Sequence, residues 1–138
     1  MAAEGLNLLS RLVALSSILA VLVVIAGTGV FAQKGTSIVT RISFAHGRTT
    51  AIERGSVRRG MSHDYLLKAR AGQTMTVHLA ARGRVSFDIL TSSGTNSVAQ
   101  GAKDWSGELP QSGDYRINVL PDTTTGRSIP YTLEVTVR

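Results

Sequence analysis

The chain of 138 residues contains no cysteine, only three prolines and only 5% aromatic residues. The lack of cysteine excludes a disulfide scaffold and any metal or iron–sulfur site built on thiolates. Charged residues are also few, at 17%, whereas 43% of the residues are apolar. Disordered chains show the opposite balance, and this length suits one domain. The composition therefore predicts one folded domain that is stabilised by its core alone.

Charge is almost absent from the N-terminal segment. Residues 1–32 contain one basic and one acidic residue, and an uninterrupted apolar run extends from Leu12 to Ala26. A short basic start, an apolar middle and a small-residue exit form the pattern of a secretory signal peptide. We therefore predict a signal peptide over residues 1–32, cleaved before Gln33, and an exported periplasmic domain over residues 33–138.

The same segment is also long enough to remain as an anchor. Residues 12–32 carry no charge, and about 20 apolar residues suffice to cross a bilayer as a helix. The alternative prediction is an uncleaved helix that holds the domain at the inner membrane, facing the periplasm. In both cases the membrane is contacted only through these residues.

After Ala32 the apolar residues follow the alternating pattern of half-buried strands, and no segment keeps a helical period. The predicted strands are 38–44, 65–70, 75–79, 85–89, 115–119 and 131–137, with weaker candidates at 51–57 and 105–109. About eight short strands, each with one apolar face, need a second sheet to cover that face. The predicted fold is an all-β antiparallel β-sandwich, preceded by the signal or anchor helix.

The same alternation predicts which residues form the core and which form the loops. The expected core residues are Val77, Phe87, Ile117, Val119, Leu133 and Val135. The longest predicted irregular stretches are 91–104 and 121–130. Loops of a sandwich usually carry its binding residues, so these stretches are candidates.

Residue patterns that indicate catalysis are missing. The three histidines, His46, His63 and His78, have no metal-ligand spacing, and neither an HExxH nor a GxSxG motif occurs. His63 precedes Asp64 directly, and adjacent strand residues point to opposite faces, so these two are not expected to pair. We predict no catalytic residue, no metal site and no cofactor, and hence a protein that is not an enzyme.

Positive charge is concentrated in the part that follows residue 32. This part holds 14 of the 15 lysines and arginines, most of them arginines, against 8 of the 9 acidic residues. The planar guanidinium group suits carboxylates, phosphates and sugars. Nucleic acid is a poor partner for an exported protein. The arginines therefore indicate either a soluble basic surface or contact with an acidic cleft or an anionic polymer of the cell envelope.

Residues 109–119 combine a Leu109-Pro110 step, a Ser112-Gly113 turn and Tyr115 at the start of an alternating strand. Together with Ala71-Gly72-Gln73 and the final strand 130–135, this segment resembles the periplasmic inhibitors of g-type lysozyme. It also resembles the broader bacterial pre-peptidase C-terminal domains. The resemblance covers about residues 38–137. We further expect a buried Tyr115 whose hydroxyl holds a neighbouring loop, and a Trp105 that is at least half-buried.

The resemblance implies a non-enzymatic protein that blocks g-type lysozyme, or another cell-wall hydrolase, with basic loops in the acidic cleft. The residues to which it assigns this contact are Arg127, Thr123, Thr124, Thr125, Met61 and Ser62. Among these, Arg127 stands where the family has one contact arginine. Met61 stands where the family has an aromatic residue, and 123–125 include the position of a second arginine. The alternative function is an envelope module that contacts anionic cell-wall or polysaccharide polymers through an arginine-rich face.

Overall fold

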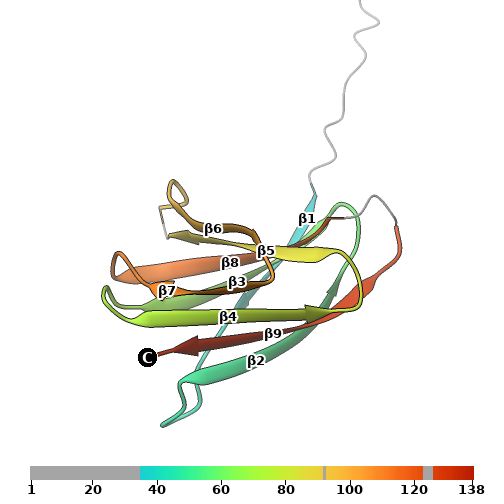
Figure 1. Cartoon of the computed structure of the whole chain (residues 1–138). Coiled ribbons are helices and arrows are strands. Elements are labelled where there is room, and N and C mark those ends of the chain that lie inside the picture. The colour runs from blue at the N-terminus through green and yellow to red at the C-terminus, as the bar shows by residue number, and fades with distance from the viewer. Residues whose placement is uncertain (1–34, 92, 123–125) are drawn as a thin grey trace, which may run out of the picture. The chain divides into compact units, whose positions relative to one another are not determined.

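The computed structural model describes residues 35–91, 93–122 and 126–138, and the predicted leader over residues 1–32 lies outside them. The described residues form nine strands (Figure 1), namely β1 (Thr36–Arg41), β2 (Thr50–Val57), β3 (Met61–Ala69), β4 (Thr74–Ala81), β5 (Val85–Thr91), β6 (Ser97–Ala102), β7 (Asp104–Glu108), β8 (Gly113–Pro121) and β9 (Ile129–Val137). No helix in this part of the chain is long and apolar enough to cross a membrane.

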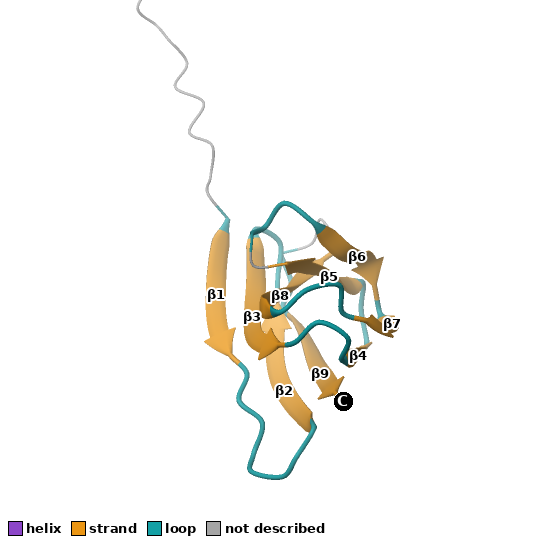
Figure 2. Ribbon diagram, turned by 90° about the vertical axis from the view of Figure 1, so that its left-hand side faces the viewer, coloured by secondary structure: helices purple, strands orange, loops and turns teal. Residues whose placement is uncertain are grey.

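The nine strands are divided between two sheets that pack face to face (Figure 2). One sheet has five strands in the order β1-β3-β8-β5-β6, and the other has four in the order β2-β9-β4-β7. The predicted all-β sandwich is confirmed. All neighbouring strands are antiparallel except β1 and β3, which run parallel. Between β1 and β3 the chain passes through β2, which lies in the opposite sheet and runs in the opposite direction. β3 therefore returns beside β1 in the same direction as β1.

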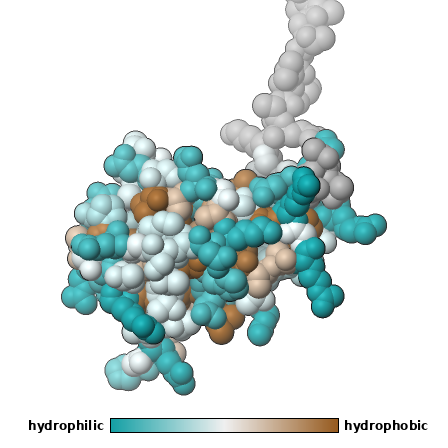
Figure 3. Space-filling view, viewed as in Figure 1, coloured by the Kyte–Doolittle hydropathy of each residue, from teal (hydrophilic) through white to brown (hydrophobic). Residues whose placement is uncertain are grey.

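The inner faces of the two sheets form one apolar core. The six predicted core residues are all fully buried, with 0% of their surface exposed: Val77, Phe87, Ile117, Val119, Leu133 and Val135. Cross-strand pairs such as Val77 with Val135 and Phe87 with Val119 keep these side chains on the inner face. Hydrophilic side chains cover most of the visible surface, where apolar residues appear only as small separate patches (Figure 3).

Two strand predictions need correction. The stretch 91–104 was expected to be irregular, yet it contains β6, an edge strand with small side chains and register shifts against β5. The first strand occupies 36–41 rather than 38–44, and its side chains Ile38 and Val39 are 40% and 60% exposed. β1 lies at the edge of its sheet, so neither of its faces is fully covered by the other sheet.

The expectations for two aromatic residues are confirmed. Tyr115 is buried, and its hydroxyl donates to the carbonyl oxygen of Gln111 at 2.5 Å and accepts from the amide of Gln111 at 3.2 Å. Trp105 is half-buried against the core, and its ring lies directly over Gly107. Gly72 and Gly113, which the resemblance singled out, have a positive φ of 84° and 142°.

A charge placed in this core should prevent folding. We expect Val77→Asp to abolish cooperative thermal unfolding, because the carboxylate would be buried without a partner. Thr76→Asp, which changes the neighbouring exposed position of β4, should retain a cooperative transition by circular dichroism. A folded Val77→Asp variant would contradict this account of the core.

Candidate functional site

The topology brings four segments to one end of the sandwich, on the right in Figure 1. Thr36 pairs with Met61, and Val57 with Ile129, so β1 starts beside the β2–β3 turn and the β8–β9 connection. The β4–β5 turn joins them, since β5 starts opposite the end of β8. We call this the arginine-rich end, after its members Arg58, Arg59, Arg82, Arg84 and Arg127.

A tight turn carries the chain from β2 in one sheet to β3 in the other. The amide of Met61 donates to the carbonyl oxygen of Arg58 at 2.9 Å, and Gly60 between them has a φ of 75°. A positive φ at the third residue is the mark of a type II turn, which glycine adopts without strain. The carbonyl of Gly60 also accepts from the amide of Thr36 at 2.9 Å, which fixes the start of β1 to the turn.

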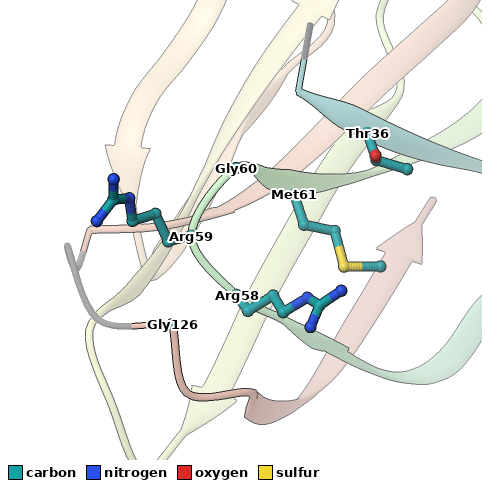
Figure 4. A pocket seen from close by; sticks show the side chains of 6 residues that line it. All are labelled: Thr36, Arg58, Arg59, Gly60, Met61 and Gly126. Carbon is teal, nitrogen blue, oxygen red and sulfur yellow. The ribbon is translucent and has the colours of Figure 1, made fainter. Parts of the chain in front are cut away.

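A hollow of about 380 Å³ lies beside this turn. It is lined by Thr36, Arg58, Arg59, Gly60, Met61 and Gly126. The thioether of Met61 and the guanidinium of Arg58 extend from the turn toward the same side, whereas Arg59 points to the other side (Figure 4). The hollow thus combines a flexible apolar side chain with cationic donors.

The structure separates the residues that the sequence assigned to partner binding. Met61 lines the hollow, and Arg127 is exposed directly after its lining residue Gly126. Ser62 is half-buried and, as the next strand residue, points to the opposite face of β3. Thr123, Thr124 and Thr125 lie outside the described residues.

Two lining residues, Arg58 and Arg59, were not assigned to the site from the sequence. The sequence does contain a pattern that indicates them. Two consecutive arginines directly before a turn glycine are expected to lie at an end of the sandwich and to extend into solvent. Which other segments share that end follows only from the pairing of the strands.

Positive charge dominates the arginine-rich end. Within the described part of the chain, Asp122 supplies a carboxylate at this end. It accepts a hydrogen bond from the hydroxyl of Ser86 at 2.8 Å. Its amide donates to the carbonyl oxygen of Arg84 at 2.9 Å. The guanidinium groups of Arg58 and Arg127 are exposed and form no ion pair with a described carboxylate. They are available to carboxylates or other anions of a partner.

A polar cluster that the sequence did not reveal lies inside the sandwich, near the edge strands β1 and β2. The hydroxyl of Tyr131 lies 2.8 Å from Nδ1 of His63 and 2.7 Å from the hydroxyl of Tyr65. Nε2 of His63 lies 2.8 Å from Oγ1 of Thr40. A Cβ on Gly55 would stand 2.6 Å from the Tyr131 hydroxyl, so only glycine leaves room for this contact.

The cluster joins the two sheets and disfavours charge on the histidine. Thr40 belongs to β1, His63 and Tyr65 to β3, and Tyr131 to β9. Burial lowers the pKa of His63, although the negative charges of Asp64 and Glu53 oppose this effect. The structure confirms that Asp64 points away from His63, because its carboxylate accepts from Ser37 and Asn118 on the outer face.

Metal-binding geometry is not found in the described ranges. No group of three or more His, Cys, Asp or Glu residues there is placed to hold a metal ion. His78 is exposed on the outer face of β4 and contacts Asp104 of β7.

No protein-family model matches the sequence, and no curated protein matches it either. Among solved structures, the fold is similar to PliG of Aeromonas hydrophila, a periplasmic inhibitor of g-type lysozyme. The two share 28% identity with a TM-score of 0.69, over 75% of this chain and 98% of the inhibitor. The expected resemblance is confirmed.

Two more distant structures share the architecture alone. PliG of Salmonella Typhimurium is 20% identical, with a TM-score of 0.62 over 75% of this chain and 100% of that one. The pre-peptidase C-terminal domain of a Bacillus anthracis collagenase is 13% identical, with a TM-score of 0.52 over 74% and 96%. The inhibitor-like sandwich therefore spans nearly all of the described residues.

The lowered pKa of His63 predicts a loss of stability in acid. The unfolded chain takes up a proton near pH 6.5, whereas the folded protein resists it, so the unfolding free energy should fall as the pH drops below about 6.5. One proton gives at most about 1.4 kcal/mol per pH unit. Urea titrations between pH 8 and pH 5 should show a smaller decrease for His63→Gln, and identical slopes would contradict the assignment.

Proposed function

We propose that this protein is a non-enzymatic inhibitor of a cell-wall hydrolase of the g-type lysozyme class, which it blocks with its arginine-rich end. The observation that carries the proposal is the similarity to the Aeromonas hydrophila inhibitor over 98% of that chain, at 28% identity. The exposed arginines around the hollow at Met61 support the choice of this end.

The chemistry of the proposed target suits such a surface. Glycoside hydrolases place carboxylates on both sides of the bond that they cleave. Arg58 and Arg127 offer planar donor groups that bind carboxylates in pairs of hydrogen bonds. Met61 adds an unbranched apolar side chain that adapts to the shape of a cleft. Thr123, Thr124 and Thr125 are proposed to surround these contacts. Ser62 points to the opposite face of β3 and lies away from Met61.

The proposed location is the periplasm, because the similar inhibitors of Aeromonas hydrophila and Salmonella Typhimurium are periplasmic proteins. A signal peptide or an anchor over residues 1–32 would deliver the domain there. Without cysteine, the core closes without any disulfide, so the fold does not depend on the oxidising conditions of that compartment.

The alternative function, an envelope module that binds anionic polymers, depends on the same excess of arginine. It differs from inhibition in its response to salt, because attraction to a polymer is screened as the ionic strength rises. If the protein is not retained on peptidoglycan, or if its retention does not change with salt, this alternative is excluded.

Inhibition can be measured directly. We expect the purified protein to slow the lysis of cell walls by a g-type lysozyme in a dose-dependent manner. A c-type lysozyme, tested in parallel, should be slowed much less, because a general effect of positive charge would act on both enzymes. No inhibition of the g-type enzyme at a large molar excess would exclude the proposed function.

The role of Arg127 can be tested separately from the function. Arg127→Ala should weaken inhibition about 10- to 100-fold, because a hydrogen bond to a charged group contributes about 1.5–3 kcal/mol. Arg116→Ala removes the same charge from an exposed position in the middle of β8 and should inhibit like the parent. If the Arg127→Ala variant inhibits as strongly as the parent, Arg127 is not part of the binding site, and the proposed inhibitory function is not contradicted.

A further inference from the structure

A second basic hollow lies at the opposite end of the sandwich, the end toward the viewer in Figure 2. It has a volume of about 400 Å³. Its lining includes Phe44, Arg48, Lys68, Arg70, Gln73 and Val137. These residues come from the β1–β2 connection, the end of β3, the turn before β4 and the end of β9, which all meet there.

The backbone holds both arginines of this hollow on closed turns. The amide of Arg48 donates to the carbonyl oxygen of Ala45 at 2.8 Å. The amide of Arg70 donates to Oε1 of Gln73 at 2.7 Å, and the amide of Gln73 donates back to the carbonyl of Arg70 at 3.2 Å. Because these turns are fixed before any ligand arrives, little backbone order has to be gained on binding.

Among the described residues, the hollow is lined with positively charged hydrogen-bond donors and with no acidic side chain. The nearest acidic residue in the sheet register is Asp114, opposite Lys68. Its carboxylate is already engaged by both terminal nitrogens of Arg41, at 3.2 and 3.3 Å. These hydrogen bonds and the charge of Lys68 lower the pKa of Asp114, so its carboxylate stays charged. Lys68 shares this counter-charge, whereas Arg48 and Arg70 form no ion pair with a described carboxylate.

One wall of the same hollow is apolar. Phe44 is half-buried against the core, and Val137 lies beside it with 8% of its surface exposed. Gln73 uses its side-chain oxygen on the Arg70 amide, so its NH₂ group is the part left to donate to a ligand. An aromatic side chain, an amide donor and several cations together match a sugar that carries an acidic group.

We propose that this hollow, formed by Phe44, Arg48, Lys68, Arg70 and Gln73, binds an acidic saccharide, meaning a sugar unit that carries a carboxylate or a phosphate. Its volume lies within the usual range of about 300–1,000 Å³ for small-molecule sites. The site is separate from the arginine-rich end and does not depend on the proposed inhibition. A saccharide polymer held here would leave the other end open to a hydrolase.

Binding can be measured by calorimetry with small probes. Trigalacturonic acid tests the carboxylate and mannose 6-phosphate tests the phosphate, while maltotriose and inorganic phosphate supply the sugar alone and the anion alone. We expect at least one acidic sugar to bind the parent protein more tightly than both controls. The preferred acidic probe identifies the charged group of the ligand.

Paired variants with equal charge test the location. Arg48→Ala with Arg70→Ala should weaken binding of the acidic sugar at least tenfold. Arg54→Ala with Lys103→Ala removes two exposed charges elsewhere and should change it less than twofold. Both double variants should still inhibit a lysozyme that the parent inhibits.

Three results would overturn the proposal. The first is no binding of either acidic sugar at millimolar concentration. The second is an equal loss of binding in both double variants, which would indicate attraction by net charge alone. The third is that maltotriose or inorganic phosphate binds as tightly as the preferred acidic sugar.

Discussion

Burial of two apolar sheet faces against each other is the constraint on which the other features depend. With no cysteine to cross-link the layers, the pairing of faces is left to side chains such as Val77 and Leu133. Every connection between consecutive strands except β5–β6 passes from one sheet to the other. The loops therefore collect at two ends, and their polar residues are brought together there although they are far apart in the chain.

The alternation of apolar residues was sufficient to predict the sandwich and its core, because burial on one face imposes a period of two. It failed where burial is incomplete. β6 carries small side chains at a sheet edge, so its residues show no alternation of large apolar groups. β1 places Ile38 and Val39 at the opposite edge, where an apolar residue need not be buried.

The site was predictable only in part. Arg127 and Met61 were assigned through a family resemblance, and the structure brings Met61 into one hollow with Gly126. The contribution of Arg58 depends on the crossing of β2 to β3 between sheets, which the sequence alone does not specify. The contact between His63 and Tyr131 joins residues that are 68 positions apart, so it too requires the strand pairing to be known.

The turn from Arg58 to Met61 has a consequence for how this surface can change over time. Its shape depends on Gly60 and on the backbone hydrogen bonds between Met61 and Arg58 and between Thr36 and Gly60. Substitutions at Arg58 can therefore alter the charge and reach of the surface while the sandwich is preserved. A surface built in this way can follow changes in a binding partner one residue at a time, without a new fold.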